Sequence, residues 1–132
     1  MFAAMGAMRH TREIPREGWA DYLFLLSTIE RDQQVRIQAG GPERGEQTVA
    51  WDLPLVDISV EEKGSDTGAI EVTVGRPGEQ LTHRILHPER LQAGESDSGE
   101  LECLDIEDAE HVRTRISFEP AELPWGAPAP PG

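Results

Sequence analysis

The sequence predicts an α+β domain in which an N-terminal amphipathic helix packs on a mainly antiparallel sheet of about six strands. One helical pattern near the N-terminus is followed by segments with the two-residue apolar period of β-strands. Turn residues separate these segments, and no helical pattern lies between them, so parallel crossovers cannot form. A small, partly closed β-barrel with an N-terminal helix is the alternative that fits the same pattern.

The composition is that of an acidic domain. The chain has 132 residues, a length that fits one domain, and a net charge of -13 at pH 7. Direct binding to nucleic acid needs clustered Lys and Arg, so we expect no nucleic-acid partner, and an anionic membrane surface is disfavoured for the same reason. The single cysteine allows no intrachain disulfide and fits a reducing compartment.

Targeting signals are not found in the sequence. No stretch approaches the run of about 18 apolar residues that a transmembrane helix needs. The N-terminal residues lack the basic region and Leu-rich run of a signal peptide. We therefore expect a cytoplasmic protein with no membrane partner. The expected organisation is a flexible N-terminal extension (1–13), a single α+β domain (14–119) and a Pro/Ala-rich disordered tail (120–132) that contains Trp125.

The helix is expected to run from Pro15 to about Glu30, because proline is tolerated at a first helical position. Phe24 and Leu25 make its apolar stripe wider than that of a free surface helix, so we expect the sheet to cover the whole stripe. The residues that recur every three to four positions and form the stripe are Trp19, Tyr22, Leu23, Leu26 and Ile29.

The strongest strand pattern is Leu53–Val60, in which apolar residues alternate with polar ones. Pro54 cannot donate to a ladder, so it marks the start of the strand, a bulge or a sheet edge. The segment Arg76-Pro77-Gly78-Glu79 has Pro and Gly at the central positions of a type II turn and predicts a hairpin. The remaining strands are expected at 35–39, at 48–51 leading into Leu53, and at 70–74, 80–86, 101–106 and 112–118.

Three residues are candidate metal ligands. A zinc site would need His83, Cys103 and His111 to meet across the sheet. His83 and His87 are four residues apart, but four residues of a strand span about 13 Å, whereas zinc lies about 2 Å from each ligand. The alternative is that each histidine makes hydrogen bonds on a half-buried strand and that Cys103 is a small core residue.

Three aromatic residues, Trp19, Tyr22 and Trp51, are candidates for lining a ligand pocket between the helix and the sheet. Aromatic residues at such positions are more often part of the core. No serine has the flanking glycines of a nucleophile elbow, and the glycine-rich segment 40–45 is not followed by the Gly-Lys-Ser/Thr of a phosphate loop. The acidic loop 95–100 lacks the carboxylate spacing of an EF-hand. We therefore predict no catalytic residue and no cofactor.

Several short motifs stand in one order at compatible spacings over roughly residues 13 to 119. They are Ile14-Pro15-Arg16 with Trp19; Leu53-Pro54-Leu55 with Ile58-Ser59; Ile70, Val72 and Val74 with Gly75; Leu81-Thr82-His83 with Ile85 and Pro88; and Ile116 with Phe118. This combination resembles a family of short bacterial proteins described as a domain of unknown function, number fifty-three thirty-five. The resemblance implies a stand-alone domain and carries over no activity, ligand or catalytic residue.

The chain departs from the family pattern in its leading residues, its proline tail and its last hairpin. There Asp108-Ala109-Glu110 stands in place of an Asp-Gly type turn. Three functions are therefore considered. The first is a non-enzymatic interaction or structural module that binds a protein partner or forms a homodimer. The second is a small-ligand binding domain with a pocket between helix and sheet, and the third, with the least support, is a metal-dependent enzyme.

Overall fold

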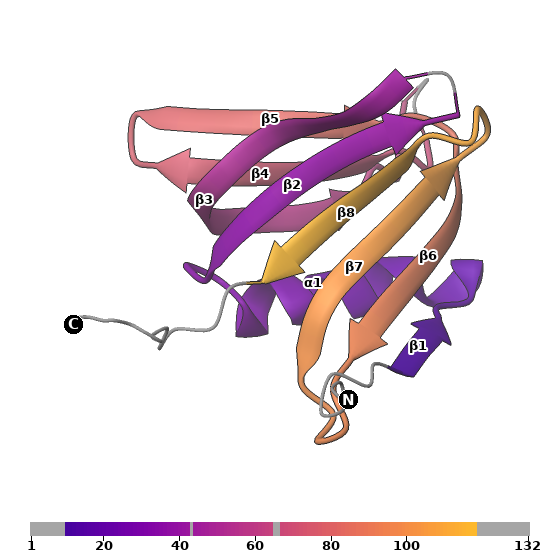
Figure 1. The fold of residues 1–132 in the computed structure, drawn as a ribbon, viewed down its shortest axis with the longest axis horizontal. Helices are drawn as coiled ribbons and strands as arrows, with labels where there is room; N and C mark the ends of the chain where they lie inside the picture. The colour runs from indigo at the N-terminus through magenta and orange to yellow at the C-terminus, as the bar shows by residue number, and fades with distance from the viewer. Residues whose placement is uncertain (1–9, 43, 65–66, 119–132) are drawn as a thin grey trace.

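The computed structural model of the protein describes residues 10–42, 44–64 and 67–118 (Figure 1). These residues form one 3-10 helix, one α-helix and eight strands. In chain order they are β1 (His10–Glu13), η2 (Arg16–Gly18), α1 (Trp19–Ile29), β2 (Gln34–Gly41), β3 (Arg44–Val60), β4 (Ile70–Arg76), β5 (Glu79–Ile85), β6 (Pro88–Glu95), β7 (Leu101–Asp108) and β8 (Arg113–Phe118).

The strands of the described chain form one sheet with the order β1-β6-β7-β8-β2-β3-β4-β5. Every neighbouring pair is antiparallel. The end strands β1 and β5 do not pair with each other, so the sheet does not close into a barrel. The α+β class with an antiparallel sheet is therefore confirmed, but the described residues contain eight strands rather than about six.

The two additional strands are β1 and β6, which pair with each other. The four residues of β1, His10-Thr11-Arg12-Glu13, are all polar and all exposed. The sequence of this strand therefore shows no alternation of apolar and polar residues. From the sequence, these residues are expected to belong to the N-terminal extension (1–13). β6 contains Pro88 and Gly94, residue types that are depleted in strands, and its buried side chains are small apart from Leu91. Neither strand has the apolar alternation of a β-strand in its own sequence. Both are strands because they pair with neighbours in the sheet, β1 with β6 and β6 with β7.

β3 is the central element of the fold, with 17 residues. Its first part pairs with β2, where Leu53 lies opposite Val35, and its second part pairs with β4, where Ile58 lies opposite Val72. Pro54 lies opposite Gln34 in the β2–β3 ladder, and register shifts occur on either side of it, between Ala50 and Leu53 and between Leu55 and Asp57. Pro54 therefore lies between two irregular points of the strand and not at its start. The expected strand Leu53–Val60 is thus the second half of a longer, bent strand.

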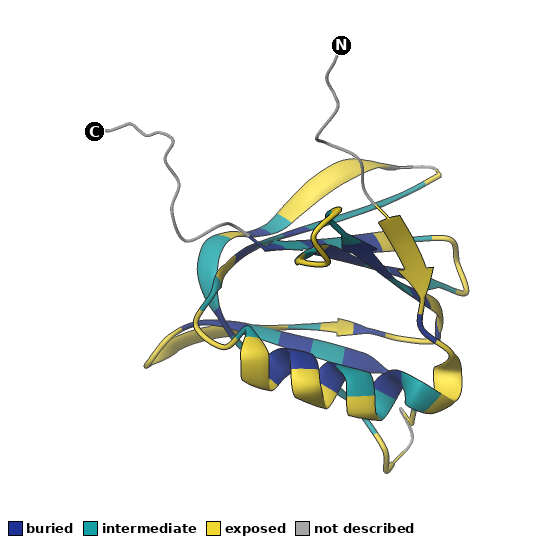
Figure 2. Cartoon of the chain, turned by 90° about the horizontal axis from the view of Figure 1, so that it is seen from below, coloured by how far each residue is buried: buried dark blue, intermediate teal, exposed yellow. Residues whose placement is uncertain are grey.

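The bend in β3 produces two layers of strands, with the second half of β3, β4 and β5 in one layer and the remaining strands in the other (Figure 2). The buried faces of the layers and one side of α1 form a single core. Its fully buried large side chains are Leu23, Val35, Ile37, Leu55, Ile58, Ile70, Val72, Val74, Leu91, Leu104, Ile106 and Ile116.

Ser27 attaches α1 to a free edge of β3. Its hydroxyl donates to the carbonyl oxygen of Ile58 and accepts from the backbone nitrogen of Ile58, both at 2.8 Å. β2 stops pairing with β3 at Pro54, so the serine hydroxyl occupies the place where the next strand would supply hydrogen bonds. The helix therefore packs chiefly on β3, along its edge.

The helix is confirmed, because η2 and α1 together cover Arg16 to Ile29. The expectation that the sheet covers the whole apolar stripe is wrong. Phe24 is 72% exposed, Leu25 59% and Ile29 71%, whereas Trp19, Leu23 and Leu26 are buried. A helix that lies along a strand edge buries one narrow stripe, and the residues beside that stripe face outward.

The β4–β5 hairpin is also confirmed. Gly78 has a φ of 85°, as the third residue of a type II turn requires. Gly75 has a φ of 127°, and a Cβ there would overlap the carbonyl oxygen of Glu79. The second arm, β5, ends at Ile85, and Pro88 begins β6. Trp125, like the rest of the tail 120–132, lies outside the described residues. Within the described part of the chain, no helix is long and apolar enough to cross a membrane.

Candidate functional site

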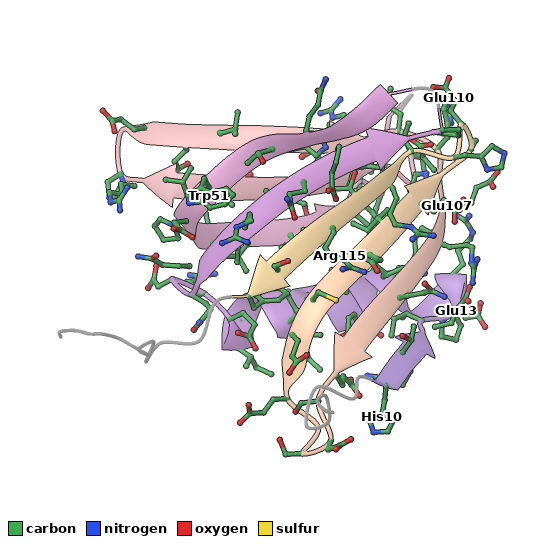
Figure 3. The ribbon with its side chains drawn as sticks, viewed as in Figure 1. His10, Glu13, Trp51, Glu107, Glu110 and Arg115 are labelled. Atoms are coloured by element: carbon green, nitrogen blue, oxygen red, sulfur yellow. The ribbon has the colours of Figure 1, made fainter. Side chains whose placement is uncertain are left out.

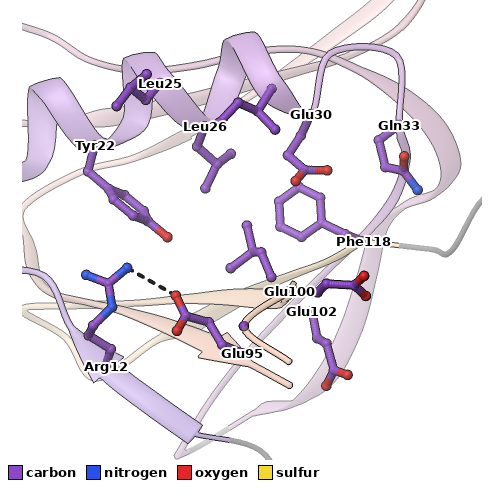
Figure 4. A pocket seen from close by; sticks show the side chains of 13 residues that line it. Arg12, Tyr22, Leu25, Leu26, Glu30, Gln33, Glu95, Glu100, Glu102 and Phe118 are labelled. Carbon is purple, nitrogen blue, oxygen red and sulfur yellow. Dashed lines mark hydrogen bonds and ion pairs between the residues drawn. The ribbon is translucent and has the colours of Figure 1, made fainter. Parts of the chain in front are cut away.

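A cleft of about 630 Å³ lies between α1 and the ends of β6, β7 and β8 (Figure 4). We call its apolar lining side chains the apolar floor and its four glutamates the acidic rim. Its apolar side chains are Leu25, Leu26, Ile29, Leu101 and Phe118, and its ionisable side chains are Arg12, Tyr22, Glu30, Glu95, Glu100 and Glu102.

The helix wall of the cleft follows from the position of α1 on the edge of β3. Leu26 lies between the core and the cleft, and Leu25 and Ile29 line the cleft while remaining largely exposed to solvent. Glu30 is the C-terminal cap, and its backbone nitrogen donates to the oxygen of Leu26 at 2.8 Å. The helix ends there, which leaves the Glu30 side chain at the cleft (Figure 4).

The facing wall is the β6–β7 hairpin, whose loop is the acidic segment 95–100. Ser96 shapes this loop: its backbone nitrogen donates to the oxygen of Glu100 at 2.9 Å, and its hydroxyl accepts from the backbone nitrogen of Glu100 at 3.2 Å. Gly99 has a φ of 90°, which closes the turn. The loop thereby places Glu95 and Glu100 on the same wall of the cleft.

The cleft carries an excess of negative charge. Four of its lining residues are glutamates and one is an arginine. Arg12 Nη2 donates to Glu95 Oε2 at 3.1 Å, and its guanidinium carbon lies 5.6 Å from the centre of the Tyr22 ring. Figure 4 shows Tyr22 on α1 facing this Arg12–Glu95 pair. The cation therefore belongs to an existing pair, which leaves an acidic rim around an apolar floor.

Burial changes the titration of two groups in the cleft. It raises the pKa of the Glu30 carboxyl above its ordinary value, because desolvation penalises the carboxylate. The pKa of Tyr22 is also raised, first by burial and further by the charges of Glu95 and Glu30, against the opposing effect of Arg12. The Tyr22 hydroxyl is therefore a protonated donor at neutral pH. Glu30 binds a proton more readily than an exposed glutamate.

The aromatic residues proposed as ligand contacts are only partly brought together. Tyr22 lines the cleft. Trp19 is 3% exposed and its indole nitrogen donates to the oxygen of Ile14 at 2.8 Å, so it is a core residue. Trp51 is 55% exposed on the outer face of β3, where the Arg36 guanidinium carbon lies 3.9 Å from its ring centre (Figure 3). Trp51 does not line the cleft.

The structure does not bring the candidate metal ligands together. His83 lies on the edge strand β5 and Cys103 is buried on β7, and four strands of the sheet lie between β5 and β7. His111 is exposed in the β7–β8 turn, with Nδ1 3.4 Å from Oε2 of Glu107. Burial lowers the pKa of His83. Among the described residues, no group of three or more His, Cys, Asp or Glu is placed to hold a metal ion.

A second hollow of about 470 Å³ lies over β2, β7 and β8. Arg115, which lines it, makes hydrogen bonds of 2.8 and 2.9 Å to both carboxylate oxygens of Asp105 (Figure 3). This hydrogen bonding raises the pKa of Arg115. Glu107 and Arg113 face each other two positions further along the same pair of strands, on the same face. Cross-strand pairs of opposite charge stabilise a sheet, and they account for this group of charges.

Arg12, Glu30, Glu95 and Phe118 are site residues that sequence analysis did not identify. They lie in β1, at the end of α1, in β6 and in β8, so only the tertiary fold collects them. One sequence feature pointed to them: the apolar stripe of the helix is wider than a single core contact needs. Of the two residues that widen it, Leu25 is exposed and lines the cleft, and Phe24 is exposed outside the cleft lining.

Comparisons with known proteins agree with the resemblance seen in the motifs. The model of a family described as "Family of unknown function (DUF5335)" matches residues 10–125. A protein of Aquifex aeolicus (strain VF5) described as "Uncharacterized protein" is 28% identical over 111 residues, which cover 84% of this chain and 94% of that protein. No solved structure matches the chain at a significant level. The chain belongs to the DUF5335 family.

Proposed function

We propose that this domain is a non-enzymatic interaction module. Its contact surface, which we call the α1 face, consists of Leu25 and Ile29 together with the adjoining cleft. The observation that carries the proposal is the exposure of these two large apolar side chains, at 59% and 71%, four positions apart on one side of the helix. Adjacent exposed apolar side chains beside polar ones are typical of a surface that another molecule covers.

The energetics favour an occupied α1 face. Fully burying one such side chain is worth about 1.5–3 kcal/mol, so a partner that covers both gains a substantial part of a binding free energy. Association costs reduce this gain, which makes the cleft beside the helix important as additional contact area. Leu25 and Ile29 belong to both the exposed stripe and the cleft, so the two form one continuous surface.

The test compares two double variants of the full chain. Leu25→Ser with Ile29→Ser removes apolar area from the α1 face, and Leu81→Ser with Leu86→Ser removes exposed apolar area elsewhere, where the side chains are 41% and 45% exposed. Affinity capture from a lysate and light scattering are measured for both variants and the parent. We expect a partner, or a second copy of the chain, to be held by the parent and the control and lost by the α1 variant.

Two results would contradict the proposal. One is that the parent chain is a strict monomer that retains no partner. The other is that both double variants lose the partner to the same extent, which would mean that general surface apolarity and not the α1 face is responsible. Circular dichroism of each variant establishes that loss of binding is not loss of folding.

A small-ligand binding role is the second candidate, and the cleft itself favours it. Its volume of about 630 Å³ falls in the range of ligand pockets, about 300–1,000 Å³. Tyr22 supplies an aromatic wall and a hydroxyl donor. A thermal-shift screen of a ligand library would reveal a ligand whose stabilising effect is reduced in Tyr22→Phe. A library in which no compound raises the melting temperature would count against this role.

A further inference from the structure

We infer that the partner presents a cationic amphipathic peptide segment, with its apolar residues on the α1 face and its Lys or Arg side chains at the acidic rim. This inference names the partner chemistry for the proposed interaction module and therefore rests on that function. Two independent features of the same surface support it: the apolar residues exposed on α1 and the charge of the residues that line the cleft.

The charge of the cleft selects a cationic ligand. The lining holds four glutamates against one arginine, and this arginine is paired with Glu95 at 3.1 Å. A neutral apolar ligand would leave these carboxylates partly desolvated at the edge of its contact, which is costly. A cation placed at the rim compensates them. The raised pKa of Glu30 has the same origin, since burial there disfavours the carboxylate until a positive charge approaches.

The shape of the surface suits a helix or an extended segment with one apolar side. An amphipathic helix buries apolar residues at three-to-four spacing in a groove while its polar side stays in water. On the α1 face, the apolar floor and the carboxylates lie side by side, with Ile29 next to Glu30 and Leu101 next to Glu100. A segment with apolar residues on one side and basic residues beside them can contact the apolar floor and the carboxylates at the same time.

Other occupants fit the charge less well. A second copy of the chain brings a net charge of -13 to an acidic surface. Residues 1–9 contain one cationic side chain, Arg9, and residues 119–132 contain none. Neither end of the chain therefore offers clustered cations. Nucleic acids and anionic membranes carry the same sign of charge as the rim.

Fluorescence anisotropy with designed peptides tests the inference on the full chain. The probe is a labelled amphipathic peptide of about five helical turns with Leu on one side and Lys on the other. A matched peptide has Glu in place of every Lys. One variant, Glu30→Gln with Glu100→Gln, removes rim charge, and a control, Glu61→Gln with Glu62→Gln, removes the same charge from residues that do not line the cleft.

We expect the Lys peptide to bind the parent and the Glu peptide not to bind. Loss of the two rim charges should weaken binding about three- to thirtyfold, since an exposed ion pair contributes a modest amount each. The control should weaken it less than about twofold. Leu25→Ser with Ile29→Ser should also weaken it, because the apolar contact is lost.

Equal losses in the rim variant and the control would overturn the inference, because general attraction to an acidic protein would then explain binding. Absence of Lys-peptide binding would also overturn it. If a lysate partner still depends on Leu25 and Ile29 in that case, the interaction module stands and only its partner chemistry is wrong. If neither the peptide nor a lysate partner depends on the α1 face, both fail.

Discussion

At the scale of single residues, Ser27 carries a structural role that its residue type alone does not indicate. Its buried hydroxyl makes two 2.8 Å hydrogen bonds to the backbone of Ile58 and so completes the edge of β3. Without this hydroxyl, an N–H and a C=O would be buried without partners where the helix meets the sheet.

Ser27→Ala is therefore expected to lower the free energy of unfolding by about 1–3 kcal/mol, the usual cost of leaving buried polar groups unsatisfied. Urea denaturation followed by circular dichroism measures this. The matched control is Thr28→Ala, which removes an exposed hydroxyl bonded to the oxygen of Phe24 within the helix. If both variants lose the same stability, Ser27 is not what holds α1 to β3.

Glu30 gives a pH-dependent prediction. Because burial raises its folded-state pKa, the stability associated with its protonated form is present at low pH and lost as the pH rises through that pKa. Its position at the C-terminal end of α1 adds an unfavourable interaction with the helix dipole. Glu30→Gln should therefore raise the melting temperature at pH 7 but not well below the pKa of Glu30.

Thermal unfolding across this pH range tests the Glu30 prediction. The control is Glu62→Gln, which removes the same charge from a glutamate that is exposed to solvent. An upward shift in Glu30→Gln that persists unchanged at low pH would show that packing, and not ionisation, causes it.

Sequence alone separated the roles of the aromatic residues only in part. Trp19 and Tyr22 are three positions apart on one helix, so their shared side could be predicted. Trp51 could not be placed, because it lies within a register shift of the β2–β3 ladder, between the paired residues Ala50 and Leu53, and such a shift changes which face a residue occupies. The distances between the histidines and Cys103 likewise depend on the order of the strands in the sheet, and the apolar periodicity of the sequence does not specify that order.

At the scale of elements, the β4–β5 hairpin was predictable because its turn chemistry is local. Gly75 adds a constraint that the sequence does not reveal, since it depends on the close approach of the opposite strand. With a φ of 127° and Glu79 backbone in the place of a Cβ, it tolerates no side chain.

Gly75→Ala should therefore cost about 1–3 kcal/mol in unfolding free energy, as is typical for a strained backbone position. Gly78→Ala is the control: its φ of 85° is also positive, but nothing lies within 4 Å of the added Cβ. It should lose less stability than Gly75→Ala. Chemical denaturation of both variants measures the difference, and a smaller loss for Gly75→Ala would contradict the account of this hairpin.

The strands β1 and β6 and the outward side of α1 show where element prediction fails. An exposed strand and a strand with Pro, Ala and Gly lack the alternation on which such prediction depends. From the wide stripe of α1 we predicted a helix wholly covered by the sheet, and the structure leaves Phe24, Leu25 and Ile29 exposed. The sequence did not reveal that the helix would lie on a strand edge, which leaves part of this surface outside the core.

At the scale of the whole molecule, the net charge of -13 opposes the compact state by self-repulsion. Added sodium chloride should therefore raise the melting temperature at pH 7 over the first few tenths molar, because the Debye length falls below about 10 Å above 0.1 M. The rise should be smaller near pH 4.3, where about half of exposed glutamates are protonated. Equal salt effects at both pH values would contradict this explanation.

The central claim, that the α1 face binds a cationic amphipathic segment, is tested most directly by NMR. The ¹⁵N-labelled full chain is titrated with the Lys peptide, and backbone amide and indole resonances are followed. We predict concentrated shifts at Tyr22, Leu25, Ile29, Glu30 and Glu100, with the indole of Trp51 on the outer face unchanged. Shifts centred on Trp51, or spread evenly over the acidic surface with no maximum at α1, would contradict the claim.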